Sequence, residues 1–397
     1  MRKIDVTDLA IFSGKPVFSE FKSTSNLFRP DFHQFCYYSE QFFTRRHYSN
    51  DGPLVKLLES RLAEFHQVNH CIAVSSGFWG LVLAIKCLAL PQKNEVIMPS
   101  LTYRRMADVV AWTGLIPHFC EVDPNTLAID AETAKEALTE NTALILGVHP
   151  IVNCCDVEGL TQLSETFGIP LLFDSVESVY ETCAGKKVGT FGNAECFSLH
   201  ASKLINGFEG GYITTNDEKL AERLRHMRSF GFYGQDNIQD MGINAKLNEI
   251  HAAMALASLD GLDEQVSHNY LIYKAYQNGL KNVSGIRILT FNEQERSSFK
   301  NIVIELLDDW PVKRATTLDI LHAEKILARP YYSPALHQKK TSYPVRAVKM
   351  RQSNLLAERF MLLPCGYMVN ESDVERVVDL LKFINNHANT INERLQK

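Results

Sequence analysis

Short apolar runs typical of strands alternate with segments of helical periodicity through the first half of the chain. Three such runs are His70–Val74, Glu95–Pro99 and Ile116–Val122, and segments of about ten residues, Trp79–Leu90 and Arg105–Thr113, lie between them. This alternation predicts βαβ units and therefore an α/β fold with a mostly parallel sheet. Ligands of such sheets bind outside the carboxyl ends of the strands. Residues at those ends are therefore the candidates for a functional site.

Polar side chains follow four of the predicted strands. They are Ser75-Ser76-Gly77, Thr102-Tyr103, His149 and Asp174. Because the carboxyl ends of parallel strands share one edge of a sheet, we expect these residues to line one pocket. The turn at Ser76 and Gly77 also opens a helix, whose free backbone N–H groups could hold a phosphate. A turn of this kind is also common without any ligand, and the longer glycine-rich phosphate signatures do not match here.

The length of 397 residues is long for one core and predicts two domains after an arm. We expect an aromatic-rich, irregular arm over residues 1–50, a large domain over 51–259 and a smaller α+β domain over 260–397. In the last of these, the runs Gly285–Leu289 and Asn301–Leu306 are typical of strands, and Ser372 is placed to cap a helix over Ser372–Asn385.

Charge and composition exclude several classes of protein. A net charge of -5 gives no reason to expect nucleic acid or an anionic membrane as a partner. No apolar run approaches the roughly 20 residues of a membrane span, and the N-terminus lacks the apolar core of a secretory signal. The nine cysteines have no zinc-like spacing and suit reduced thiols, so we expect a cytoplasmic protein without a metal site.

A lysine follows the strand-end aspartate at a distance of about 30 residues. Lys203 lies in a polar loop with Ser198 and His200, upstream of Glu209-Gly210-Gly211. A lysine amine forms a Schiff base with an aldehyde, and a carboxylate keeps a pyridine nitrogen protonated so that the ring can accept electrons. The pairing of Lys203 with Asp174 therefore indicates pyridoxal 5′-phosphate (PLP) chemistry. Either residue alone would be unremarkable, and His149 or His200 could equally be a satisfied core histidine.

Taken together, these motifs resemble the DegT-type nucleotide-sugar aminotransferases, PLP enzymes of fold type I. The matching segments are Ser198-x-His200-x-x-Lys203, Glu209-Gly210-Gly211, Asp174, Thr102-Tyr103, Gly242–Lys246, Asn50–Pro53 and Ala328–Tyr332. The lysine loop and Gly147-Val148-His149 look most like the branch that aminates C4 of dTDP-4-keto-6-deoxyglucose.

The resemblance implies a homodimer that transfers the amino group of glutamate to a nucleotide-linked keto-deoxy sugar. It implies that Lys203 and Asp174 are catalytic. The cofactor contacts it implies are Ser76, Gly77, Phe78, Tyr103, Asp174, Glu177, Ser198, His200, Lys203 and, reaching the neighbouring subunit, Asn244. The substrate contacts it implies are Thr102, His149, Lys246, Arg329, Tyr331 and Tyr332. The alternatives are a C3-keto sugar aminotransferase, a PLP-dependent sugar dehydratase, whose known forms carry His in place of the lysine, and a non-catalytic regulatory relative.

The chain departs from the family pattern at two positions. Phe78 replaces the usual threonine after the glycine of the phosphate turn, and Glu177 replaces the usual glutamine or histidine three residues after the aspartate. The first change removes a hydroxyl but leaves the backbone amides. We expect Glu177 to contact a sugar hydroxyl or the surroundings of Asp174; the alternative is that it turns away to the protein backbone.

Overall fold

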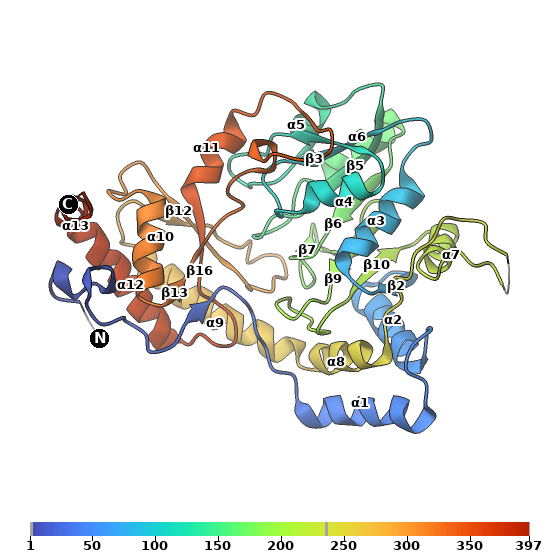
Figure 1. Ribbon diagram of the computed structural model, residues 1–397, viewed down its shortest axis with the longest axis horizontal. Helices are drawn as coiled ribbons and strands as arrows, with labels where there is room; N and C mark the ends of the chain where they lie inside the picture. The colour runs from blue at the N-terminus through green and yellow to red at the C-terminus, as the bar shows by residue number, and fades with distance from the viewer. Residues whose placement is uncertain (1–2, 235–236, 397) are drawn as a thin grey trace.

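The computed structural model describes residues 3–234 and 237–396 and contains an eight-stranded, mostly parallel sheet (Figure 1). The order across this sheet is β15-β4-β3-β5-β6-β9-β10-β2. Neighbours from β15 to β9 run parallel, whereas β10 is antiparallel to both β9 and β2. The strands are β2 (His70–Val74), β3 (Glu95–Pro99), β4 (Ile116–Cys120), β5 (Thr142–Val148), β6 (Leu171–Asp174), β9 (Ala194–Ser198), β10 (Gly211–Thr215) and β15 (Arg346–Ala347). The predicted α/β class is confirmed.

Helices cover both faces of this sheet, which explains why most of its strand residues are buried. Along β6, Leu172 packs into the cluster under α3, α4 and α7, while Leu171 and Phe173 pack under α5 and α6. Such alternation follows from the two-residue period of a strand. The helices of this half are α2 (Pro53–His66), α3 (Gly77–Leu88), α4 (Met106–Trp112), α5 (Ala131–Glu136), α6 (Val157–Phe167), α7 (Glu218–Met227) and α8 (Glu249–Asp260).

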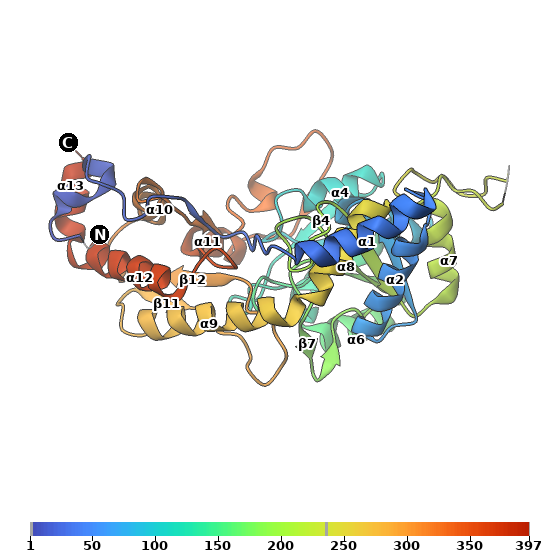
Figure 2. The same cartoon turned by 90° about the horizontal axis from the view of Figure 1, so that it is seen from below.

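A second, antiparallel sheet of four strands, in the order β11-β12-β16-β14, forms the smaller half. Figure 2 shows this half at the opposite end of the molecule, with α9 running between the two. Its strands are β11 (Ile286–Ile288), β12 (Ile302–Leu306), β14 (Arg329–Pro330) and β16 (Phe360–Leu363), and its helices are α9 (Leu262–Leu280), α10 (Arg314–Ala323), α12 (Glu371–Asn386) and α13 (Ala388–Leu395). The shorter elements include α11 (Gln352–Arg359), the hairpin of β7 (Thr182–Cys183) and β8 (Lys186–Lys187), and β1 (Lys22–Ser23), which pairs with β13 (Ile326–Leu327).

Two expectations about local structure are wrong. The first 50 residues are not irregular throughout, because Phe32–Arg45 forms a 14-residue helix, α1, capped by Asp31 and packed on α8. Its aromatic residues lie on both faces, which hid the helical period. Ser372 does not cap α12; the side chain of Asn370 accepts from the backbone N–H of Asp373 instead.

The beginning of the chain packs on the smaller half. Val6, Leu9, Val17 and Phe18 belong to the same hydrophobic cluster as α9, α10 and α12. Figure 2 accordingly shows the N-terminal residues beside the C-terminal helix α13. The division into three segments stays a prediction. Within residues 3–234 and 237–396, no helix is both long enough and apolar enough to cross a bilayer.

Candidate active site

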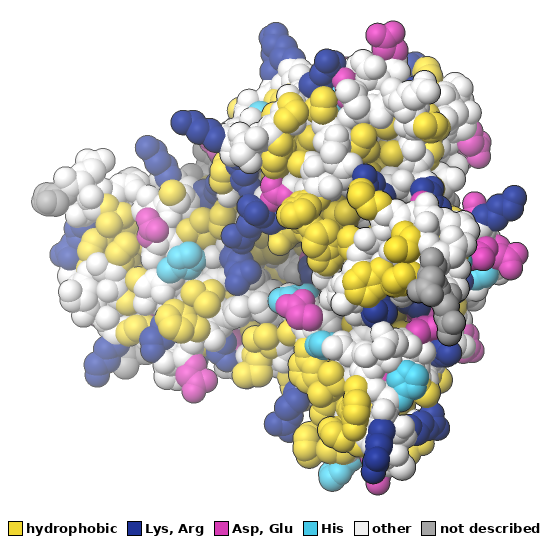
Figure 3. Space-filling view, turned by 45° about the vertical axis from the view of Figure 1, so that its right-hand side comes forward, with side chains coloured by type: hydrophobic (Ala, Val, Ile, Leu, Met, Phe, Trp, Pro, Cys, Tyr) yellow, Lys and Arg dark blue, Asp and Glu magenta, His cyan; other side chains and the backbone are white. Residues whose placement is uncertain are grey.

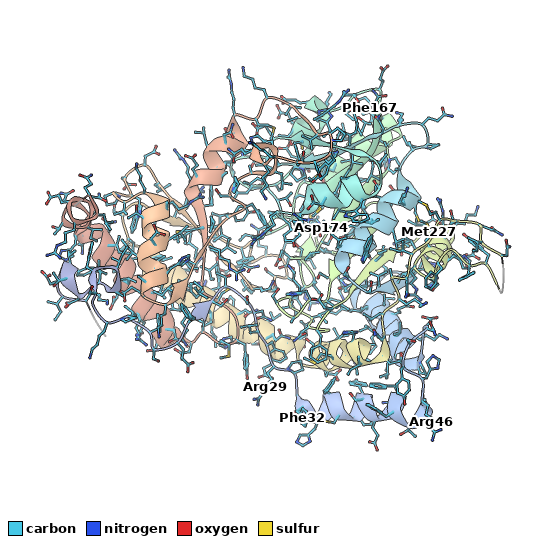
Figure 4. The ribbon with its side chains drawn as sticks, in the orientation of Figure 1. Arg29, Phe32, Arg46, Phe167, Asp174 and Met227 are labelled. Atoms are coloured by element: carbon cyan, nitrogen blue, oxygen red, sulfur yellow. The ribbon has the colours of Figure 1, made fainter. Side chains whose placement is uncertain are left out.

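A cavity of about 340 Å³ lies at the carboxyl end of the parallel strands and contains most of the predicted site. Asp174, at the end of β6, faces the interior near the centre of the molecule (Figure 4). The predicted residues that line the cavity are Ser76, Gly77, Phe78, Thr102, Tyr103, His149, Asp174, Glu177, Ser198, His200, Lys203 and Tyr332. The expectation that the strand ends meet in one pocket is therefore confirmed, although Ser75 does not line it.

Strand register brings these ends together. Val148 at the end of β5 pairs with Asp174 at the end of β6, and Asp174 pairs with Cys196, two residues before the end of β9. On the far side, Gly211 of β10 pairs with Ser198. The loop that carries Lys203 leaves β9 and returns into β10, so the lysine is held close to the aspartate.

The N-terminus of α3 is pressed against β9 and β10 because two glycines leave room for it. A Cβ atom added to Gly77 would lie 3.1 Å from the carbonyl oxygen of Phe197 and from Cβ of Ser198. A Cβ added to Gly211 would lie only 2.4 Å from the backbone nitrogen of Gly77. This close approach presents the first amides of α3 to the cavity, which suits an anion such as a phosphate. The hydroxyl of Ser76 accepts from the N–H of Trp79 at 3.3 Å and caps the helix.

The side chain of Asp174 is buried and accepts one hydrogen bond from the described residues of the protein. Its Oδ1 accepts from the backbone N–H of Val176 at 3.2 Å. Burial raises the pKa of Asp174 from 3.8 to about 6, against the opposing influence of the Val176 N–H and of Lys203. A buried carboxylate in this state gains from a cationic partner within the cavity. A protonated pyridine nitrogen would be such a partner.

Glu177 binds the amine of Lys203. Its Oε1 accepts a hydrogen bond from Nζ of Lys203, and its Oε2 accepts from Nζ of Lys300 at 2.7 Å and from Nδ2 of Asn301 at 3.2 Å. Burial raises the pKa of the Glu177 carboxyl, but the two lysines outweigh burial and hold that pKa well below its ordinary value. Glu177 therefore lies in the surroundings of Asp174, as one alternative expected. Its partners are the side chains of two lysines and an asparagine, so it does not turn away to the protein backbone.

A second cavity, of about 720 Å³, adjoins Lys203 on the side of the smaller half. Its cationic lining comprises Arg104, Lys203, Lys300, Arg329 and Lys339, whereas Glu177 is the acidic residue among the described residues that line it. Tyr103, Tyr332 and Thr102 line both cavities. In Figure 3, Lys and Arg side chains gather at the hollow between the two halves. Such a surface suits a ligand that carries phosphates.

Two of the expected substrate contacts do not fit the structure. Tyr331 is 1% exposed and packs in the core of the smaller half, so it cannot touch a ligand in either cavity. His149 lies at the wall of the first cavity, but its ring stacks on Phe173, with Nδ1 at Cys155 and Nε2 3.8 Å from Glu195. Both nitrogens therefore face protein groups.

The segment Gly242–Lys246 does not line either cavity of its own chain. Asn244 is exposed and bridges to Ser229, and Nζ of Lys246 lies 4.5 Å from the ring centre of Phe230. The predicted role of Asn244 requires a neighbouring subunit and stays a prediction. The residues missed entirely are Lys300 and Asn301, which precede β12 and lie more than 120 positions from Glu177. Their only signal in the sequence is a polar pair directly before an apolar strand.

Comparison with known proteins agrees with this geometry. The model of the DegT/DnrJ/EryC1/StrS aminotransferase family matches residues 35–382. The chain belongs to this family. The aminotransferase is 27% identical over 356 residues to a dTDP-4-amino-4,6-dideoxy-D-glucose transaminase of Shigella dysenteriae, covering 89% of this chain and 96% of the relative. It is also 27% identical over 345 residues to a GDP-perosamine synthase of Vibrio cholerae, covering 84% of this chain and 91% of that relative.

Among solved structures, the aminotransferase resembles DesI, crystallised in the presence of its TDP-sugar product. The two superpose with a TM-score of 0.94 at 30% sequence identity, covering 99% of this chain and 100% of DesI. The cofactor of the aminotransferase is PLP. The residues fit this group, because the glycine-lined N-terminus of α3 suits its phosphate, buried Asp174 suits its pyridine nitrogen and Lys203 supplies a primary amine in the same cavity.

Proposed function

We propose that this aminotransferase moves an amino group from glutamate to a keto-deoxy sugar carried on a nucleoside diphosphate. The observation that carries this proposal is the second cavity, which opens at Lys203 and presents Arg104, Arg329 and Lys339 toward a ligand. A diphosphate bound there would leave the attached sugar at the mouth of the first cavity, between Tyr103 and Tyr332. The acceptor we favour is dTDP-4-keto-6-deoxyglucose, aminated at C4, because relatives over most of the chain act on dTDP sugars by their names.

The chain's own residues have distinct roles in this reaction. When bound, PLP supplies the electron sink. The amine of Lys203 would bind the PLP aldehyde, and once released it would carry the proton between the carbon that bears the amino group and the cofactor. Asp174 would hold the pyridine nitrogen in its protonated form. Ser198 and the amides at Gly77 and Phe78 would hold its phosphate, and Tyr103, half exposed at the cavity mouth, would stack on its ring.

Two experiments test this function. Borohydride reduction of the purified enzyme, followed by peptide mapping, should place the cofactor on the peptide that contains Lys203; attachment to any other peptide would remove Lys203 from this role. An amino-transfer assay should then compare dTDP-4-keto-6-deoxyglucose, a GDP-linked 4-keto sugar and a 3-keto sugar, with glutamate as donor and the aminated carbon located by NMR. Turnover of none of these nucleotide sugars would refute the proposed substrate class.

We also propose that the enzyme is a homodimer with composite active sites. The exposed aromatic residues of the N-terminal segment, Phe32, Tyr37, Phe43 and Tyr48, gather around α1, where Figure 3 shows a hydrophobic surface. A patch of this kind suits a protein interface. Asn244 of one subunit would then reach the phosphate site of the other. Mixing inactive Lys203→Ala subunits with impaired Asn244→Ala subunits should restore activity, since each hybrid contains one complete site. A fully active monomer in sedimentation experiments would contradict this arrangement.

A further inference from the structure

Lys203 shares a carboxylate with a second buried lysine. Nζ of Lys300 is bound to Oε2 of Glu177, while the amine of Lys203 is bound to Oε1 of the same group. All three side chains are largely buried, with 6% of the Lys300 side chain, 16% of Glu177 and 19% of Lys203 exposed. Asn301 is the fourth side chain of this network, with its Nδ2 donating to Oε2 of Glu177 at 3.2 Å. The reactive lysine is therefore held by a network that comes mostly from outside its own loop.

This network connects the two halves of the molecule. Lys300 and Asn301 reach Glu177 from the segment before β12, which packs on the chain after β6. In that contact, the N–H of Thr182 donates to the carbonyl of Arg296 at 3.1 Å, and the hydroxyl of Ser298 donates to Glu181 at 2.8 Å. The segment that carries Lys300 is thus held in place by contacts that do not involve Lys203.

The charges in this network oppose one another at Lys203. A carboxylate in contact with an amine favours the charged ammonium, which is not nucleophilic. A second cation on the same carboxylate disfavours the ammonium, since the two like charges lie on the order of 5 Å apart when each contacts one oxygen of one carboxyl group. Glu177 alone would therefore hold Lys203 in an unreactive form, and Lys300 offsets that effect while Glu177 still orients the amine.

We propose that Glu177 and Lys300 are a pair of positioning residues, in which Glu177 orients the amine of Lys203 and Lys300 keeps that amine able to lose its proton. The proposal rests on the proposed role of Lys203 as the lysine that bonds the cofactor. It assigns a function to the position where this chain departs from the family pattern, and it extends the active site to a residue of the smaller half.

The other charged or titratable groups that line the two cavities with Lys203 stay constant in the test. They are Asp174, His149 and Tyr332 around the first cavity, His200 and Glu209 on its own loop, Tyr103 at the mouth, and Arg104, Arg329 and Lys339 across the second cavity. None of these groups contacts the carboxylate of Glu177 within the hydrogen bonds and ion pairs of residues 3–234 and 237–396, so substitutions at Glu177 and Lys300 isolate the pair.

The test measures the reactivity of the Lys203 amine in the full-length protein freed of cofactor. Trace acylation with acetic anhydride between pH 6 and pH 11, read by peptide mass spectrometry, gives the pH at which labelling of Lys203 is half-maximal, with exposed Lys56 as the internal reference. Lys300→Met should raise this midpoint by about 1 pH unit, whereas Glu177→Gln should lower it by a similar amount. The double variant should return close to the wild-type value, and Lys300→Arg should leave it almost unchanged.

Two controls separate this role from a purely structural one. Lys274→Met removes a lysine from another ion pair of the smaller half, Lys274–Glu293 at 3.0 Å, and should not move the Lys203 midpoint. Circular dichroism of each variant checks folding, and Lys300→Gln replaces Lys300→Met if the latter does not fold. Unchanged midpoints in both single variants, or shifts of the same sign, would overturn the proposal. Borohydride mapping of the cofactor-bound enzyme tests separately whether Lys203 bonds the cofactor. A failure of the Glu177–Lys300 proposal can therefore be distinguished from a failure of the proposed role of Lys203.

Discussion

Replacing Asp174 by asparagine should make the cofactor-free protein more stable and the enzyme much less active. Asparagine keeps the acceptor for the N–H of Val176 and nearly the same volume, but removes the charge. Burial raises the pKa of Asp174 from 3.8 to about 6, so the folded protein favours the protonated acid. The pKa of Asp174 in the folded protein thus lies about two units above its ordinary value. At about 1.4 kcal/mol for each unit, ionising Asp174 costs about 3 kcal/mol more in the folded protein than in the unfolded chain.

The pH dependence follows from the direction of this shift. The contribution of protonated Asp174 to the free energy of unfolding is fully present below about pH 4, and it is lost as the pH rises through about 6. Asp174→Asn should accordingly match the wild type near pH 4 and exceed it by up to about 3 kcal/mol at pH 8. Urea unfolding of the cofactor-free proteins, followed by circular dichroism at four pH values, measures this difference. Added PLP should stabilise the wild type more than the variant, because only the wild type offers a carboxylate to the pyridine nitrogen.

A matched control is Asp319→Asn, which changes an exposed aspartate on α10. Its effect on the free energy of unfolding should be within about 0.5 kcal/mol at every pH. In amino transfer, Asp174→Asn should be slower than the wild type by at least ~10²-fold, the scale of a lost charge-stabilising group. A difference in stability that does not change between pH 4 and pH 8 would refute the electrostatic reasoning. Near-normal turnover would remove Asp174 from the mechanism.

Three further predictions follow from contacts around the site. Gly211→Ala should destabilise the protein by about 1–3 kcal/mol and weaken PLP binding, because the new Cβ would meet the backbone of Gly77. Urea unfolding measures the first effect and titration with PLP the second. An unchanged affinity for PLP would contradict the close packing of α3. Arg228→Met should cost about 3 kcal/mol in urea unfolding, because buried Arg228 bridges Glu59 and Asp51; a cost below about 0.5 kcal/mol would show that the bridge is not stabilising. A hydrogen bond with Cys154 lowers the pKa of Cys183, so Cys183 should react with iodoacetamide at neutral pH and Cys154→Ala should slow that reaction; an unaltered rate would count against the pairing.

The periodicity of the sequence predicted the large sheet and most of the residues that line the cofactor cavity. The run before Asp174 and the runs before Ser75 and Thr102 are short, apolar and separated by helical segments, and such a pattern depends on local order alone. Because parallel strands place their carboxyl ends at one edge, the side chains that follow them had to meet once the strands paired.

The local sequence pattern was not sufficient to predict an element or a side-chain contact whose packing partner is remote in the sequence. The aromatic residues of α1 lie on both of its faces, so their period is weak, and the helix is held by packing on α8. Tyr331 was placed near the substrate because the segment Ala328–Tyr332 resembles a family segment. Successive side chains nevertheless point to different surroundings, and of the two tyrosines only Tyr332 reaches the cavities.

The sequence by itself determined the fold class, the strand-end residues and the association of Lys203 with Asp174, since each depends on spacing along the chain. The tertiary structure alone decided that Glu177 binds Lys203 and that Lys300 and Asn301 bind Glu177. Those contacts arise from the docking of the segment before β12 on the chain after β6, a packing of two halves whose interacting residues are more than 100 positions apart. No local periodicity encodes such a contact, because it is set by how whole elements bury their surfaces against one another.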